Sequence, residues 1–226
     1  NRGQAQLVRD LATSGRLVQL ALAPAGTGKT TATRALATAW AYSGGNIVAL
    51  APSATAAGQL GEELGGGIHA DTLHKLTYEI GQPRPADWVR AVDANTLIII
   101  DEAGRAAPSE LAVAMQAGHR VLLVGDHYQL PPTFSEEVKD AICQRYSVEE
   151  GSPLFGSDFE RIFDSVYGKK VGTTLLSQYR MAPTIGEVVS TCFYRGELET
   201  GRGEPPKYYE LLPEHLSKQV LWIDTA

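Results

Sequence analysis

The chain has 226 residues, of which 43% are hydrophobic and 20% are charged, as expected of a globular protein with a full core. Its formal net charge of −6 argues against a protein that coats nucleic acid through a basic surface, and no apolar run reaches the roughly 18 residues that a membrane span needs. The two cysteines lack CxxC spacing, so we expect neither a disulfide framework nor a zinc site, and we expect a cytoplasmic location.

Short apolar runs alternate with helical patterns through the first part of the chain. In chain order, the predicted elements are strand 18–23, helix 29–42, strand 47–51, helix 54–64, strand 97–100, helix 108–117 and strand 121–124. Continuously apolar strands separated by helices are typical of a buried parallel sheet with helices on both faces. We therefore predict an α/β fold that binds its ligands at the carboxyl ends of the strands.

The pattern weakens after Pro131, and a new unit is predicted to start near Thr173. The elements predicted in this part are helix 155–167, strand 173–176, helix 185–192 and strand 219–223. The sequence begins without a methionine and stops just after the last of these strands. We expect a piece of a longer protein, with one domain over 1–172 and the truncated start of a second over 173–226.

A phosphate-binding loop is predicted between the first strand and the first helix. Residues 23–30 read APAGTGKT and match the pattern GxxxxGK[ST], except that Ala23 replaces the first glycine. The glycines let backbone N–H groups face a phosphate, and the following helix N-terminus favours negative charge. Lys29 can reach the β- and γ-phosphates, and Thr30 can bind Mg²⁺. The predicted nucleotide contacts in this loop are Ala25, Gly26, Thr27, Gly28, Lys29, Thr30 and Thr31.

Two carboxylates follow the apolar strand 97–100. Asp101, at the tip of the strand, can hold the magnesium ion together with Thr30. Glu102 can orient and deprotonate the attacking water, because adjacent side chains on a strand diverge and can take different roles. The alternative, an ordinary polar strand end, becomes less favoured once the phosphate loop is considered as well.

In their order along the chain, the phosphate loop, the DEAG sequence 101–104 and the GDHYQLPP sequence 125–132 resemble the superfamily 1 helicases. The resemblance implies a RecA-like P-loop NTPase that uses ATP and Mg²⁺. The third sequence is the discriminating one, because it is not a general feature of P-loop proteins. In that family its glutamine contacts the γ-phosphate, and this role is carried to Gln129, with Asp126 in support.

Further residues resemble elements of the same superfamily. Gln4 matches the glutamine that reads the adenine edge, with Gln6 as an alternative. The segment 51–57 resembles an element that touches the nucleic-acid backbone, and 72–74 resembles the TLH element beside it. The nucleic-acid contacts that this implies are Pro52, Ser53, Thr55, Thr72 and His74, although a purely structural role for His74 is equally open.

The sequence QYRM at 178–181 resembles the motif that opens the second RecA-like domain of these proteins. Its arginine approaches the γ-phosphate across the domain cleft, and this implies a catalytic role for Arg180. Residues 152–155 and 193–194 resemble the RNA-surveillance helicases, whereas 1–126 resembles the helicase part of conjugative relaxases. Both groups belong to the 5′-to-3′ branch of the superfamily.

The predicted function is therefore an ATP-dependent helicase or translocase core that acts on single-stranded nucleic acid, with DNA favoured over RNA. The later motifs of the second motor domain are not found in this sequence, so the remainder of that domain is expected elsewhere. Two alternatives stay open. One is a nucleotide-gated nucleic-acid binding module that does not unwind, and the other is a different P-loop phosphotransferase or switch.

Overall fold

The computed structural model describes residues 2–65, 67–149, 151–203 and 211. Its main feature is a sheet of six parallel strands in the order β3-β2-β4-β5-β1-β6. The strands are β1 (Val18–Leu22), β2 (Asn46–Ala51), β3 (His69–Thr72), β4 (Thr96–Ile100), β5 (Arg120–Gly125) and β6 (Gly172–Thr174). The predicted α/β fold with a parallel sheet is confirmed.

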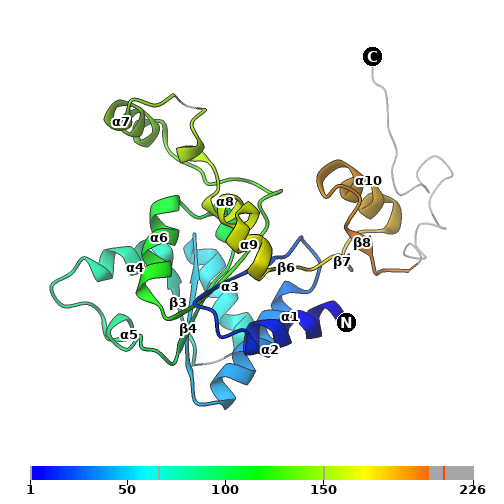
Figure 1. Cartoon of the computed structure of the whole chain (residues 1–226), viewed down its shortest axis with the longest axis horizontal. Coiled ribbons are helices and arrows are strands. Elements are labelled where there is room, and N and C mark those ends of the chain that lie inside the picture. The colour runs from blue at the N-terminus through cyan, green and yellow to red at the C-terminus, as the bar shows by residue number, and fades with distance from the viewer. Residues whose placement is uncertain (1, 66, 150, 204–210, 212–226) are drawn as a thin grey trace.

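Helices cover both faces of this sheet (Figure 1). One face carries α1 (Arg2–Thr13), α2 (Lys29–Tyr42) and α3 (Ala54–Leu64). The other face carries α4 (Leu73–Ile80), the 3-10 turn η1 (Ala103–Arg105), α6 (Pro108–Ala117), α8 (Asp158–Asp164) and α9 (Val166–Val171). The short helix α5 (Asp87–Arg90) follows α4 along the chain. The described part of the chain holds no helix that is long and apolar enough to cross a membrane.

Strand β4 shows why the sheet is buried on both sides. Leu97 and Ile99 belong to the hydrophobic cluster under α1–α3, whereas Ile98 and Ile100 belong to the cluster under α4 and α6. Successive side chains of a strand point to opposite faces, so a run of apolar residues serves both layers. The three isoleucines are fully buried. The continuous apolar run, rather than an alternating one, follows from this burial.

A second, much smaller unit follows the sheet. The small lobe, residues 177–203, contains β7 (Ser177–Gln178), α10 (Pro183–Phe193) and β8 (Glu199–Thr200), and its two strands form a separate parallel pair. Figure 1 shows it beside the main sheet, joined to it through β6. Residues 2–174, apart from an arm formed by residues 131–157, are called the body.

The strand that we expected to open the second domain lies elsewhere. Residues 172–174 form β6, which pairs with β1 at the edge of the main sheet, so this strand belongs to the body. The prediction of its place was wrong, because a three-residue strand carries no pattern that assigns it to a sheet. The division into domains 1–172 and 173–226 stays a prediction. The predicted strand 219–223 lies outside the described residues.

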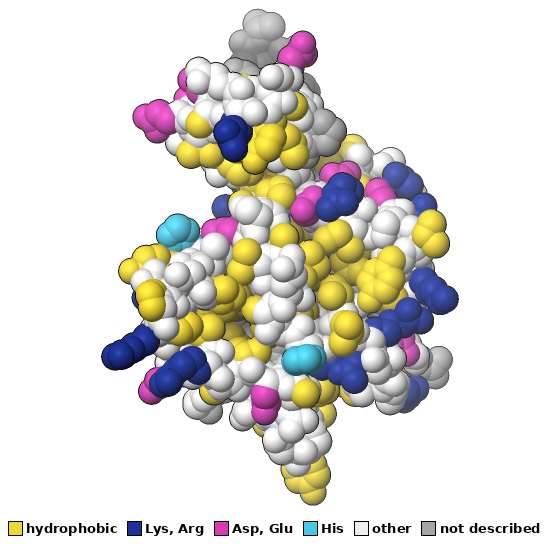
Figure 2. All heavy atoms as spheres, turned by 60° about the vertical axis from the view of Figure 1, so that its left-hand side comes forward, with side chains coloured by type: hydrophobic (Ala, Val, Ile, Leu, Met, Phe, Trp, Pro, Cys, Tyr) yellow, Lys and Arg dark blue, Asp and Glu magenta, His cyan; other side chains and the backbone are white. Residues whose placement is uncertain are grey.

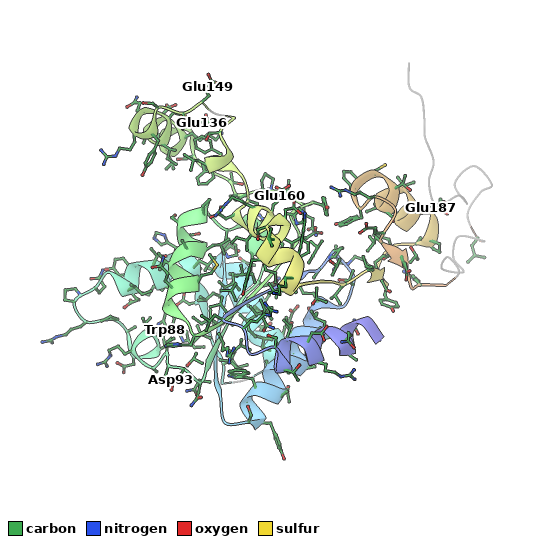
Figure 3. All side chains as sticks on the ribbon, viewed as in Figure 1. Trp88, Asp93, Glu136, Glu149, Glu160 and Glu187 are labelled. Atoms are coloured by element: carbon green, nitrogen blue, oxygen red, sulfur yellow. The ribbon has the colours of Figure 1, made fainter. Side chains whose placement is uncertain are left out.

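The weakly patterned segment after Pro131 forms an arm, residues 131–157. It contains α7 (Glu136–Tyr146), which has no buried residue, and the 3-10 turn η2 (Pro153–Phe155). Figure 1 shows α7 standing away from the layers, and Figure 2 shows the arm projecting above the rest of the surface. Glu136 and Glu149 mark it in Figure 3. The helix predicted over 155–167 is two helices, α8 and α9, because Ser165 ends the first and caps the second.

Candidate active site

The predicted phosphate loop is a tight turn between β1 and α2. Gly26 and Gly28 have positive φ angles of 79° and 78°, a conformation that favours glycine. The Thr27 side chain is buried, and its hydroxyl donates to the carbonyl of Pro24 at 2.7 Å. Ala23 is buried and donates its N–H to Gly125 O at 2.9 Å. A small alanine therefore fits where the pattern has its first glycine, since position 23 continues the strand.

The lysine of the loop contacts the first carboxylate of β4's tip. Lys29 Nζ lies 2.7 Å from Asp101 Oδ1 and 2.8 Å from Oδ2. The Asp101 side chain is 12% exposed, so the ion pair is largely sheltered from water. The structure thus brings together two of the predicted catalytic residues, 72 positions apart in the chain. An arriving phosphate would compete with Asp101 for this lysine, because both are oxyanions.

The hydroxyl of Thr30 also has a partner. Thr30 Oγ1 donates to Glu63 Oε2 at 2.9 Å, and Glu63 is the penultimate residue of α3. A hydroxyl has one proton and two acceptor lone pairs, so this donation leaves the lone pairs free for a cation. Thr31, beside it, is exposed on the surface of α2.

The second carboxylate, Glu102, has an unusual backbone. Its φ is 51°, in the left-handed region that costs energy for a residue other than glycine. The side chain pairs with Arg105, whose Nη1 lies 3.2 Å from Glu102 Oε2. Asp101 Oδ1 accepts the Glu102 N–H at 2.9 Å. The sharp turn after β4 therefore points Asp101 and Glu102 to different partners.

In the GDHYQLPP sequence, Gln129 is hydrogen-bonded to the nearby Asp126. Gln129 Nε2 donates to Asp126 Oδ2 at 2.6 Å, and Asp126 Oδ1 accepts the Tyr128 N–H at 3.2 Å. Tyr194, from the small lobe, also donates its hydroxyl to Asp126 Oδ2, at 2.5 Å. Burial raises the pKa of Tyr194, and its hydrogen bond to Asp126 adds to this, so the hydroxyl keeps its proton.

These groups surround a common cavity of about 100 Å³. Its lining residues are Ala23, Lys29, Glu102, Gly104, Arg105, Gly125, Asp126, Gln129 and Leu130. Three of the five predicted catalytic side chains thus share one cavity, at the carboxyl ends of the strands, and a fourth, Asp101, is bonded to Lys29. Such a position is where parallel α/β sheets bind their ligands.

Gln4 and Arg180 lie on either side of the loop glycines. Gln4 Nε2 donates to Thr27 O at 3.0 Å and to Gly28 O at 3.4 Å. A Cβ at Gly28 would collide with the Gln4 amide, and one at Gly26 would collide with Arg180. Gly26 and Gly28 are therefore needed for close packing as well as for their backbone angles. Gln6 instead donates to Asp10 on the surface of α1.

The QYRM turn is built around its glutamine. Gln178 is fully buried, and its Oε1 accepts the N–H groups of Arg180 at 2.9 Å and Met181 at 2.7 Å. Its Nε2 donates to Thr200 Oγ1 at 3.0 Å, which ties β7 to β8. The Tyr179 N–H donates to Gly26 O at 2.9 Å, so the turn lies directly on the phosphate loop. Arg180 itself is exposed.

The predicted nucleic-acid contacts follow β2 and β3, whose ends pair Ala51 with Thr72. Ser53 Oγ accepts the Ala56 N–H at 3.2 Å, and Thr72 Oγ1 accepts the Lys75 N–H at 3.0 Å, so both hydroxyls cap helices. The other members are placed as follows: Pro52 is half-buried, Thr55 is exposed, and His74 is largely exposed with Nδ1 3.9 Å from Glu110 Oε1. The structure brings these two segments together at one edge.

Three residues at this site have no role in our sequence prediction. Arg105 stands three positions after Glu102, where its charge could have been noticed. Tyr194 belongs to a segment recognised by resemblance, yet nothing in the sequence assigns it a partner. Glu63 lies near the end of α3 and carries no signal at all, because its contact depends on how α2 and α3 pack.

Comparisons with known proteins agree with this geometry. Two family models described as an AAA domain match the chain, one over residues 1–150 and the other over 154–226. The conjugal transfer protein TraA of Rhizobium radiobacter is 35% identical over 135 residues, covering 58% of this chain and 12% of that protein. The ATP-dependent RecD2 DNA helicase of Deinococcus radiodurans is 38% identical over 140 residues, covering 57% and 18%. The chain therefore spans less than a fifth of the length of these relatives.

A solved structure shares the fold. The Pif1 helicase from Bacteroides, in complex with ADP-AlF3 and single-stranded DNA, matches with a TM-score of 0.55. The match covers 84% of this chain and 45% of that one, at 20% identity. At such low identity the likeness shows the arrangement of the sheet and helices alone.

Proposed function

We propose that this chain, which belongs to the AAA domain family as a superfamily 1 helicase-type member, is the ATP-binding core of a motor that moves on single-stranded nucleic acid. The observation that carries the proposal is the shared cavity in which Lys29, Glu102 and Gln129 meet. A charge for the phosphates, a base for water and a group that can sense the γ-phosphate are the parts that ATP hydrolysis needs.

The proposed reaction is the attack of water on the γ-phosphorus of ATP. The new bond joins the water oxygen to phosphorus, the bond to the β–γ bridging oxygen breaks, and the water proton passes to Glu102. Lys29 stabilises the negative charge on the phosphates. Gln129 donates an N–H to a γ-phosphate oxygen. Arg180, whose backbone and Cβ lie against Gly26 of the phosphate loop, supplies its guanidinium to the charge that develops in the transition state.

The residues present also fit a magnesium ion. Thr30 and Asp101 offer the hard oxygen ligands that Mg²⁺ prefers. The Thr30 hydroxyl donates its hydrogen bond to Glu63, so its lone pairs stay available to a cation. When bound, the ion would neutralise phosphate charge. The adenine would lie on the side of the loop where Gln4 packs against Gly28.

Single-stranded nucleic acid is the proposed track, and DNA is favoured over RNA because residues 1–126 resemble the relaxase helicases. The edge where β2 and β3 end offers the two helix N-termini capped by Ser53 and Thr72, which suit contacts with phosphate oxygens. Thr55 and His74 are exposed beside them. We further propose that the small lobe begins a second motor domain, completed elsewhere in the full protein, and that the protein is cytoplasmic.

Strand-dependent ATP hydrolysis tests the proposal. The 226-residue chain should bind Mg-ATP, hydrolyse it weakly, and fail to displace a strand from a tailed duplex. A longer natural chain that carries these residues and the rest of the second domain should hydrolyse ATP faster when single-stranded DNA or RNA is added. If the short chain unwinds the duplex as well as the longer one, unwinding does not need the rest of the second domain and that part of the proposal is wrong. Absence of hydrolysis with every strand supplied would overturn the motor assignment.

A further inference from the structure

Asp126 connects the body to the small lobe through one carboxylate oxygen. Its Oδ2 accepts two hydrogen bonds, from Gln129 Nε2 at 2.6 Å and from the Tyr194 hydroxyl at 2.5 Å. Asp126 and Gln129 follow β5 in the body, whereas Tyr194 directly follows α10, the helix that Glu187 marks in Figure 3. A residue of the small lobe and the proposed γ-phosphate sensor thus share an acceptor atom.

The contact between Asp126 and Tyr194 is partly buried, and neighbouring groups fix its geometry. Asp126 is 7% exposed, so its carboxylate depends on protein donors rather than on water. The ring of Tyr194 meets that of Tyr128 edge to face, with centroids 5.2 Å apart. A pocket lined by Pro24, Tyr128, Gln129, Met181 and Tyr194, among others, separates the phosphate loop from α10. The hydroxyl therefore has a defined position relative to Gln129.

The chemistry of the amide gives the contact a consequence. The Gln129 Nε2 has two N–H groups, and the bond to Asp126 uses one of them. Phosphate oxygens accept hydrogen bonds and cannot donate, so only the N–H side of this amide can serve a γ-phosphate. A carboxylate that holds one N–H fixes which side of the amide faces the cavity, and a second donor on the same oxygen fixes the carboxylate.

We propose that Tyr194 is a positioning residue for Gln129: through Asp126 it orients the amide toward the γ-phosphate, and it makes that orientation depend on where the small lobe sits. The inference rests on the proposed function, because it requires ATP in the cavity. The small lobe then contacts the site at two places, Tyr194 on Asp126 and the Tyr179 N–H on Gly26. A movement of α10 therefore changes the orientation of the Gln129 amide, the group that senses the γ-phosphate.

Tyr194→Phe tests this, since it removes the hydroxyl and keeps the ring. Affinities for a non-hydrolysable ATP analogue and for ADP are measured by calorimetry. The loss of one hydrogen bond to a charged group should weaken the analogue by about tenfold and leave ADP unchanged. Tyr42→Phe, at a side chain that is 95% exposed, is the matched control. Equal loss for both nucleotides, or no loss for either, would overturn the proposal.

A double-mutant cycle separates positioning from a purely structural role. In a Gln129→Ala background, Tyr194→Phe should no longer change the ratio of the two affinities, because the amide that it orients is gone. The same tenfold change in that background would show that Tyr194 acts independently of Gln129. Lys29→Ala identifies failure of the underlying function. If that variant weakens both nucleotides while Tyr194→Phe weakens neither, the phosphate site stands and only the role of Tyr194 is lost.

Discussion

The body and the small lobe differ in how firmly their residues are held. The body has a six-stranded sheet with the fully buried side chains of Ile98, Ile99 and Ile100 at its centre. The small lobe has two strands of two residues each and one helix, and its buried apolar side chains are only Ala182 and Leu198. Regions with few buried apolar groups open at low free energy, so we expect the small lobe to move more readily than the body.

The proposed functional groups are divided in the same way. Lys29, Asp101 and Glu102 lie at the ends of helices and strands of the body, which fix their geometry. Arg180 and Tyr194 belong to the small lobe and reach the site from outside. A ligand shifts an equilibrium only by its different affinity for the two states. We therefore expect the groups that bind the nucleotide to lie in the body, and the groups that respond to it to lie in the small lobe.

The largest effect should come from the mobile side. Arg180→Ala should slow ATP hydrolysis by on the order of 10³-fold or more, because an arginine that stabilises the transferring phosphoryl group contributes about that much. The affinity for ADP should change little, because ADP lacks the γ-phosphate that Arg180 engages. The measurement is single-turnover hydrolysis set against binding affinity, with the exposed Arg84→Ala as control. An equal loss of affinity would show that Arg180 binds the nucleotide. It would contradict the difference between a body that binds and a small lobe that responds.

Glu102→Gln should have the next largest effect, on the rigid side. A general base contributes about 10²–10⁴-fold, so the variant should hold ATP and turn it over slowly. The same two measurements apply, in a chain that contains both motor domains. Glu110→Gln, a carboxylate on α6 that does not line the cavity, serves as the control. Normal turnover by Glu102→Gln would show that another group takes the proton.

Lys29→Ala should reduce nucleotide affinity by roughly 10–100-fold, the equivalent of one charge-assisted contact of about 1.5–3 kcal/mol. The variant also leaves Asp101 without its ion-pair partner. Titration with a fluorescent ATP analogue measures the loss, and Lys139→Ala on the arm is the control. Affinity as high as that of the unmodified chain would reject the phosphate loop.

The smallest effect concerns the stability of the body alone. Burial lowers the pKa of His127, whose ring packs against Phe159 and Phe163. The unfolded chain therefore binds the proton first, and stability that is complete above about pH 6.5 is lost as the pH falls through the lowered folded pKa. His127→Phe should lose less stability than the unmodified chain below pH 6.5. Urea midpoints from pH 5 to 7.5 measure this, with exposed His74→Phe as control.

Much of the body could be predicted from the sequence, for a physical reason. Its strands are continuous apolar runs, and the glycine-rich turn after β1 and the acids after β4 stand at strand ends. Such local patterns fix where phosphate-binding groups must lie in a parallel sheet. The helix boundaries 29–42, 54–64 and 108–117 are those of α2, α3 and α6. The functional roles of the predicted site residues stay predictions.

The small lobe and its contacts depend on tertiary structure. Strand β6 has three residues and could join either sheet as far as its sequence is concerned. The contact of Tyr194 with Asp126 spans 68 positions, and no spacing rule connects them. The break at Ser165 arises because its hydroxyl accepts the Gly168 N–H, a capping bond inside an otherwise helical pattern. The contacts between the body and the small lobe therefore could not be predicted from the sequence.

Hydrogen exchange of the small lobe, with ADP or with a non-hydrolysable ATP analogue bound, tests the central claim most directly. We predict that both nucleotides protect the amides of residues 23–30. Only the analogue should add protection at Tyr179–Met181 and around Tyr194, because only the γ-phosphate engages Arg180 and Gln129. Identical protection of the small lobe by both nucleotides would contradict an account in which the body binds ATP and the small lobe responds to it.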